Sequence, residues 1–133
     1  MVTDMQSRHV SVVVRTAPER VYAFAAQPGN LRRWAAGLAQ ADVQERGEDL
    51  VLQSPMGEVT VRFVPHNDFG VLDHAVTLPS GTTVNNPLRV VAHPDGSEVI
   101  FTVRQIELTD EEFDRDCRLV AEDLDRLRAI LEG

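Results

Sequence analysis

Lysine is absent from this sequence, because all 13 basic residues are arginine. A protein without lysine cannot form a lysine Schiff base, which excludes a pyridoxal-phosphate linkage of that kind. Cysteine is nearly absent as well: Cys117 is the only one, so no internal disulfide is possible. Cys117 falls on the apolar stripe of a predicted helix, and we expect it to be a packed core thiol rather than a nucleophile.

Long apolar runs are also missing. No run approaches the roughly 18 residues that span a bilayer, and residues 1–8 lack the apolar core of a signal peptide. We therefore expect a cytoplasmic protein with no membrane partner. The formal net charge of −8 argues against nucleic acid as a partner, since phosphate binding requires a basic face. The length of 133 residues, with 43% hydrophobic residues, predicts one soluble domain over residues 1–133.

Motifs for metal, phosphate and hydrolytic chemistry are absent from the sequence. The four histidines are scattered and form no HxH or HExxH spacing, and there is no CxxC, so we expect no metal site. A glycine-rich phosphate loop and a GxSxG element are also missing, which disfavours serine and cysteine hydrolases. We expect no cofactor.

The most regular segment is the last one, Thr109 to Leu131, which predicts a single long amphipathic helix. Thr109 and Glu112 have the spacing of a capping box. Spacings of three and four residues give the helix one apolar stripe, made of Phe113, Cys117, Val120, Leu124, Leu127 and Leu131. The rest of the helix is acidic, and is either a solvated face or a docking surface for a basic partner. Its carboxylates are Asp110, Glu111, Glu112, Asp114, Asp116, Glu122, Asp123, Asp125 and Glu132.

The chain before this helix predicts strands and two short helices. Residues 9–15 are strand-like, Pro18 suits the first position of a short helix, and a second helical piece is expected at about Asn30 to Trp34. From Leu38 onward, strand patterns alternate with turn signals, which predicts six strands in an antiparallel meander. The turn signals are Gly47-Glu48, Pro55-Met56-Gly57, Asn67-Asp68, Pro79-Ser80-Gly81 and Pro94-Asp95-Gly96.

This order of elements resembles the START-like helix-grip superfamily (SRPBCC), and in particular its small bacterial polyketide cyclase/dehydrase-like proteins. The resemblance is carried by VSVVVRTAPERVYAFAAQPGNLRRW, from Val10 to Trp34, and by FGVLDHAVTLPSGTTVNNPLRVV, from Phe69 to Val91. It covers essentially the whole chain. It implies an α+β fold in which a seven-stranded curved antiparallel sheet wraps a long C-terminal helix, with two short helices between strands 1 and 2. It also implies a cavity between the sheet and that helix.

Strand alternation predicts which side chains face the helix. The turn at Asn67-Asp68 would pair Phe63 with Leu72 and Val61 with His74. The turn centred on Ser80 would pair His74 with Asn86, and the turn at Asp95-Gly96 would pair Asn86 with Gln105, Leu88 with Val103 and Val90 with Phe101. Three polar side chains, His74, Asn86 and Gln105, then form one inward row. They either hydrogen-bond one another or a buried water, or they orient a ligand's carbonyl or hydroxyl in an apolar pocket.

On the opposite face the same registers predict a contact between Asp73 and Arg104, with Arg89 beside it. If the registers were inverted near the strand ends, Arg89 and Arg104 would instead face the cavity and could hold a carboxylate. We expect Trp34 to cover the mouth of the cavity.

These patterns leave three functions open. The first is binding of a small hydrophobic or aromatic molecule, by a monomer or a homodimer. The second, implied by the resemblance, is a cyclase or dehydrase with His74 as its acid–base group, since an imidazole pKa near 6.5 suits that role. The third is a protein-interaction module that uses the acidic helix. The candidate ligand-binding residues are Trp34, Val61, Phe63, His74, Asn86, Leu88, Phe101 and Gln105.

Overall fold

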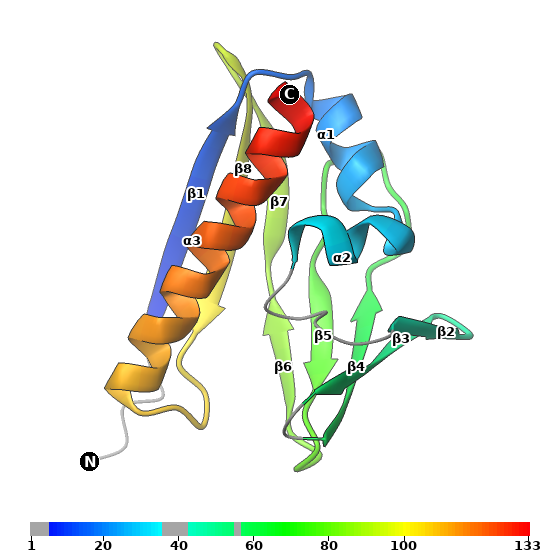
Figure 1. Ribbon diagram of the computed structural model, residues 1–133, viewed down its shortest axis with the longest axis vertical. Helices are drawn as coiled ribbons and strands as arrows, with labels where there is room; N and C mark the ends of the chain where they lie inside the picture. The colour runs from blue at the N-terminus through cyan, green and yellow to red at the C-terminus, as the bar shows by residue number, and fades with distance from the viewer. Residues whose placement is uncertain (1–5, 36–42, 55–56) are drawn as a thin grey trace.

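The computed structural model describes residues 6–35, 43–54 and 57–133. This part of the chain forms an α+β fold (Figure 1). It contains eight strands, two short α-helices, a short 3₁₀ helix and a long C-terminal helix. In order, they are β1 (Ser7–Val14), α1 (Pro18–Ala25), η1 (Pro28–Asn30), α2 (Leu31–Trp34), β2 (Val43–Arg46), β3 (Asp49–Ser54), β4 (Gly57–Phe63), β5 (His74–Thr77), β6 (Thr83–Asn86), β7 (Leu88–His93), β8 (Gly96–Arg104) and α3 (Asp110–Glu132).

The strands form two antiparallel sheets rather than the expected seven-stranded sheet. One has the order β1-β8-β7, and the other has the order β2-β3-β4-β5-β6. The additional strand arises at Pro87, which has no backbone N–H and divides an expected single strand into β6 and β7. Hydrogen bonds still connect β7 to the segment that leads into β5, because Leu72 N donates to Leu88 O and Val90 N donates to Gly70 O.

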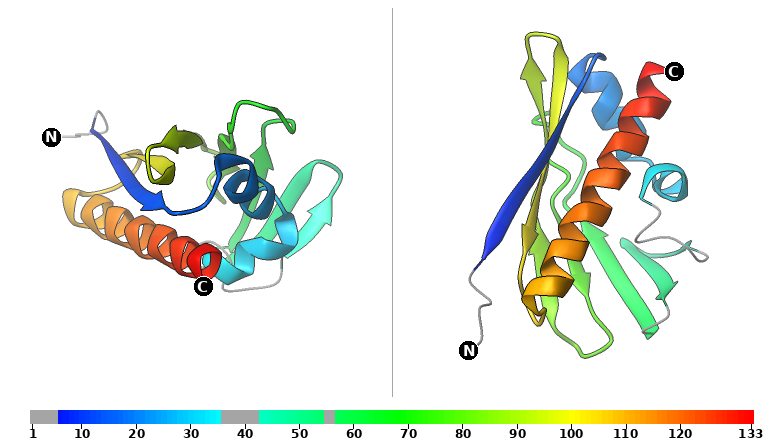
Figure 2. Two further views of the ribbon diagram at one scale, coloured as in Figure 1. Left: turned by 90° about the horizontal axis from the view of Figure 1, so that it is seen from above. Right: turned by 60° about the vertical axis from the view of Figure 1, so that its left-hand side comes forward.

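Helix α3 follows the sequence prediction closely. The Thr109 side chain accepts from Glu112 N and the Glu112 carboxylate accepts from Thr109 N, so the predicted capping box is confirmed. The helix packs on β1, β8 and α2 (Figures 1 and 2). Its apolar stripe is buried apart from Val120, which is half-buried. The lone thiol of Cys117 is buried within this stripe, and burial raises its pKa.

The short helices begin and end where the prolines predict. Pro18 is the first residue of α1, and Pro28 begins η1, which leads directly into α2. Figure 1 shows α1 above α2 and the β2–β3 hairpin below α2. The expected start of the meander at Leu38, and Pro55 and Met56 of one expected turn, lie outside the described residues.

Two of the predicted registers are wrong by two residues. Phe63 pairs with His74 rather than with Leu72, and Leu88 pairs with Phe101 rather than with Val103. The predicted pairing of His74 with Asn86 is confirmed. A shift of two residues keeps each side chain on its predicted face, because side chains alternate with a period of two. The inward apolar phase of the strands was therefore predicted correctly, although the partners in these two strand pairs were not.

Both shifts have a local cause. Residues 64–73 form a wider loop in place of a two-residue turn, with Asn67 Oδ1 accepting from Phe69 N and Val71 N. In the other hairpin the turn is Pro94-Asp95, and Gly96 already belongs to β8. A Cβ at Gly96 would lie 2.5 Å from the carbonyl oxygen of Val14, so this close approach requires glycine.

Candidate functional site

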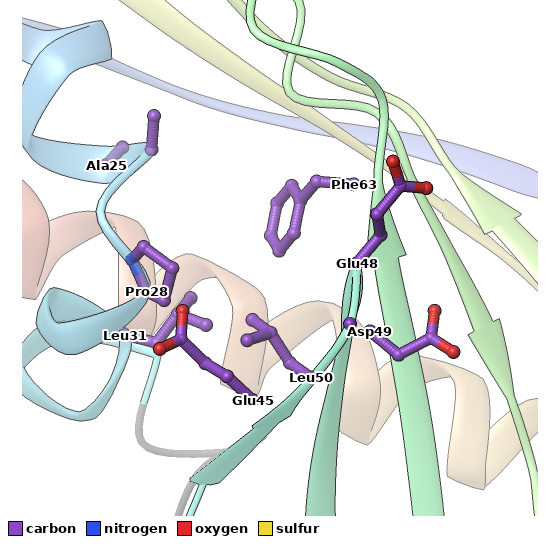
Figure 3. A pocket seen from close by; sticks show the side chains of 10 residues that line it. Ala25, Pro28, Leu31, Glu45, Glu48, Asp49, Leu50 and Phe63 are labelled. Carbon is purple, nitrogen blue, oxygen red and sulfur yellow. The ribbon is translucent and has the colours of Figure 1, made fainter.

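The candidate site is a pocket between the short helices and the β2–β3 hairpin (Figure 3). Its volume is about 130 Å³, which is comparable with the roughly 150 Å³ of an engineered cavity known to hold benzene. One aromatic ring would therefore fill it. Its described lining is Ala25, Ala26, Pro28 and Leu31 from the helices, Glu45, Gly47, Glu48, Asp49 and Leu50 from the hairpin, and Phe63 from the end of β4.

The pocket is not where the resemblance implies. The expected cavity lies between the sheet and the C-terminal helix, yet no α3 residue is among the described residues that line this pocket. The inward side chains of α3 fill that space instead: Phe113, Leu124 and Leu127 are each at most 1% exposed. The structure therefore places the candidate site away from α3, between the short helices and the β2–β3 hairpin.

Behind the pocket wall lies a cluster of three rings. The ring centroids of Phe63 and His74 are 4.8 Å apart, and those of His74 and Phe101 are 5.6 Å apart. Phe63 is half-buried, while His74 is only 3% exposed. The imidazole therefore contacts two phenyl rings, that of Phe63 at a tilt and that of Phe101 edge-on, and Phe63 is the member of the cluster that also lines the pocket.

The hydrogen bonding of His74 fixes which ring nitrogen is available. Nδ1 lies 3.0 Å from the carbonyl oxygen of Leu72, which can only accept, so Nδ1 carries the proton and donates. Nε2 is then left with its lone pair, and it has no hydrogen-bond partner in the described structure. Burial lowers the pKa of His74, against weaker opposing effects from the Leu72 carbonyl and the Asp73 carboxylate. At neutral pH this group is therefore a buried, neutral hydrogen-bond acceptor.

Trp34 is the second buried side chain with an unsatisfied polar atom. It ends α2, is 3% exposed, and its Nε1–H has no acceptor in the described part of the chain. Its backbone carbonyl accepts from Arg126 of α3 at 2.9 Å. The expectation that Trp34 covers the mouth of a cavity is not met, because Trp34 packs in the core and is absent from the pocket lining.

The predicted polar row is broken at Gln105. This residue follows β8 and is fully buried, and its Nε2 donates to Leu108 O and to an Asp110 carboxylate oxygen. It therefore ties the end of β8 to the start of α3. Because β7 and β8 pair two residues away from the predicted register, Gln105 does not pair with Asn86. Asn86 is half-buried and pairs with His74, so these two members of the row are adjacent.

The remaining candidates divide between core and surface. Val61, Leu88 and Phe101 are buried in the apolar core, as their strand phase predicts. The predicted contact between Asp73 and Arg104 is wrong. Asp73 instead binds Arg89 through two hydrogen bonds of 3.0 and 2.7 Å, and Arg104 donates to Ser7. Both arginines are exposed, so neither is a cavity residue.

Most carboxylates of the acidic helix have interaction partners within the chain. Six of its nine carboxylates accept a hydrogen bond or form a salt bridge with another residue of the chain, which favours a solvated structural face over a dedicated docking surface. They are Asp110, Glu112, Asp114, Asp123, Asp125 and Glu132. In the described segments, no group of three or more metal-binding side chains is assembled. No helix there combines the length and apolar character needed to cross a membrane.

Sequence reasoning did not identify the helix and hairpin residues that line the pocket. Leu31 is about fifteen residues before Glu45 and Glu48 along the chain, and no periodic pattern links it to them. The available signals were Pro28, which turns the chain between α1 and α2, and Gly47, which forms the hairpin turn at φ 64°.

No protein-family model matches the chain, and no curated protein matches it. Solved structures do share its fold. Protein XoxI from Bacillus cereus has a TM-score of 0.74 at 17% identity, with 97% of each chain covered. The Aha1 dimer from Colwellia psychrerythraea has a TM-score of 0.73 at 17% identity, over 96% of this chain and 97% of that one. An uncharacterised protein from Bacillus thuringiensis has a TM-score of 0.72 at 13% identity, over 96% and 100%. At these identities the similarity shows the fold alone.

Proposed function

We propose that the protein binds a small aromatic or apolar molecule whose hydroxyl or amine donates a hydrogen bond to Nε2 of His74. The observation that carries this proposal is the unpartnered Nε2 in a side chain that is only 3% exposed. A buried acceptor without a partner costs about 1–3 kcal/mol, so it requires an explanation. A bound donor in an otherwise apolar site supplies one.

The pocket provides an entry to this acceptor. Phe63 lines the pocket, and its ring is in contact with the imidazole of His74. Rotation of this one half-buried side chain would join the pocket to Nε2. An aromatic ligand could then take the place of the Phe63 ring against His74.

Assignment of the chain to the START-like helix-grip superfamily belongs to the same proposal. It is supported by the two segments that resemble the superfamily, by the order of strand, short helices, strands and long helix, and by the fold shared with XoxI and Aha1. The expected small-molecule site of such proteins agrees with a binding role, although the pocket here is displaced from α3.

The cyclase or dehydrase alternative has less support. Acid–base turnover needs a second proton-transfer group beside His74. The Asp73 carboxylate is directed to the opposite face and is held by Arg89 and by the backbone N–H of Leu88. We therefore favour binding over catalysis.

A matched pair of compounds tests the proposed function. Para-ethylphenol carries an O–H donor, whereas para-ethylanisole has the same ring and alkyl arm without it. We expect para-ethylphenol to raise the Tm of the wild-type protein in a thermal-shift assay, and to do so more than para-ethylanisole. The His74→Leu variant should lose this difference. Equal shifts by both compounds, or a difference that persists in the variant, would contradict the proposal.

A further inference from the structure

The open rim of the pocket carries a concentration of acidic side chains. The β2–β3 hairpin turns at Gly47 with Arg46 paired to Asp49, and this tight turn brings Glu45, Glu48 and Asp49 into the pocket lining. In Figure 3 the Glu45 carboxylate extends toward Pro28 and Leu31 across the opening, while the Asp49 carboxylate is directed away from it. Glu45 and Glu48 are both exposed.

Only one of these three carboxylates is neutralised. Asp49 forms a salt bridge with Arg62, with 2.6 Å between Oδ1 and Nε. Glu45 and Glu48 form no salt bridge with any described residue. None of the ten described residues that line the pocket is basic. The opening therefore carries two carboxylates without a salt-bridge partner among the described residues, on a protein whose formal net charge is already −8.

The pocket also has apolar and aromatic side chains in its wall. They include Leu31, Leu50 and Phe63, and a phenyl ring attracts cations as well as apolar groups. Beyond Phe63 lies the unpartnered acceptor of His74, which needs a hydrogen-bond donor. The acidic rim and the apolar side chains belong to the pocket, and the ring of His74 lies against the Phe63 side chain that lines it.

We propose that the ligand is a small organic cation: an ammonium group on a short arm, attached to an aromatic ring that bears a hydroxyl. The ammonium lies at the rim beside the Glu45 carboxylate, with Glu48 adding to the negative charge of the same hairpin, and the ring fills the pocket against Leu50. Once Phe63 rotates aside, the hydroxyl reaches His74. This rests on the proposed function and adds to it the sign of the ligand's charge. An anionic ligand of the same shape is repelled by the rim.

Three probes of nearly equal shape and different charge test the proposal. They are tyramine, which is a cation at neutral pH, para-ethylphenol, which is neutral, and para-hydroxyphenylpropanoate, which is an anion. Isothermal titration calorimetry gives the Kd of each. We expect tyramine to bind up to about tenfold more tightly than para-ethylphenol, from its attraction to the exposed carboxylates of the rim, and the propanoate to bind most weakly. Raising the salt concentration to about 0.5 M should reduce the preference for tyramine, since exposed charges are screened.

Two variants locate the origin of the preference. In Glu45→Gln/Glu48→Gln the affinity for tyramine should fall to that for para-ethylphenol, while the affinity for para-ethylphenol stays unchanged. Glu122→Gln is the control for removing an exposed carboxylate, because Glu122 is an exposed α3 residue away from the pocket lining. It should keep the full preference. Circular dichroism confirms that each variant is folded.

The outcomes separate this inference from the proposed function. Equal binding of tyramine and para-ethylphenol by the wild-type protein overturns the charge preference and leaves small-molecule binding intact. A preference that survives in the double variant, or that is insensitive to salt, also overturns the assignment to the rim. If none of the three probes binds, the proposed function fails for phenolic ligands and the inference fails with it.

Discussion

The ring of Phe63 lies against the ring of His74, with 4.8 Å between their centroids and 34° between their planes. Phe63 also forms part of the pocket wall. One side chain therefore contacts both the pocket and a buried imidazole whose Nε2 has no partner in the described structure. This arrangement makes Phe63 the gate of the proposed site and His74 its polar anchor.

Truncation of Phe63 should open this gate. In Phe63→Ala the pocket would extend to His74, and we expect para-ethylphenol to associate several-fold faster in stopped-flow fluorescence. The free energy of unfolding should fall by about 1–3 kcal/mol, less than for a fully buried phenylalanine, because Phe63 is only half-buried. Phe63→Leu, which retains much of the apolar wall, is the matched control. An unchanged association rate in the alanine variant would show that Phe63 does not limit access.

Replacement of His74 should affect binding more than folding. In His74→Leu the protein loses the hydrogen bond from Nδ1 to Leu72 O, worth about 1 kcal/mol, and also loses an unsatisfied acceptor that costs about 1–3 kcal/mol. We therefore expect the unliganded variant to be within about 1 kcal/mol of the wild type, or more stable, in urea unfolding. A loss of more than about 2 kcal/mol would mean that His74 is primarily a structural residue.

The pH dependence of stability should carry a signature of His74. Burial lowers its pKa in the folded protein below the unfolded value of about 6.5. Below about pH 6.5 the unfolded chain binds a proton that the folded protein does not, so the contribution is fully present above that pH and is lost as the pH falls. The free energy of unfolding should drop by up to about 1.4 kcal/mol per pH unit from this group. His74→Leu should show a shallower slope, and identical slopes would contradict the assignment.

The ion pair of Asp73 and Arg89 should matter mainly through its backbone contact. Arg89 is half exposed, so Arg89→Ala should cost only about 0–1 kcal/mol. Asp73 also accepts from Leu88 N, so Asp73→Ala should cost more, by about 1 kcal/mol. Arg89 lowers the pKa of Asp73, and the stabilisation is therefore present above about pH 3.9 and lost as the pH falls below it. Urea unfolding of both variants at pH 7 measures the difference; equal losses would refute it.

Local patterns in the sequence predicted much of the fold. The capping box of Thr109 and Glu112, the stripe of α3 and the proline-initiated helices depend on spacings within one segment, and the structure confirms them. Inward and outward phases also follow from alternation, which is why His74 was expected to face inward. Partners across strands depend on loop geometry: the Asn67 loop and Gly96 each shifted a register by two residues.

The candidate site was only partly predictable. Phe63 and His74 belong to paired strands, so alternation could bring them to one face. Gln105 was misplaced because the shifted register puts it beyond the end of β8. The pocket itself depends on how Leu31 of a short helix lies against Glu45 and Leu50 of a hairpin, and no local pattern encodes that contact.

The most direct test of the account is the ¹⁵N NMR resonance of His74 Nε2, followed as para-ethylphenol is added to labelled protein at pH 7. In the free protein we expect the neutral form with the proton on Nδ1. On binding, the Nε2 resonance should shift in the direction of a nitrogen that accepts a hydrogen bond, and para-ethylanisole should not cause this shift. A ligand that binds and leaves Nε2 unchanged, or no binding at all, would contradict the central claim that this buried nitrogen is the anchor of a ligand site.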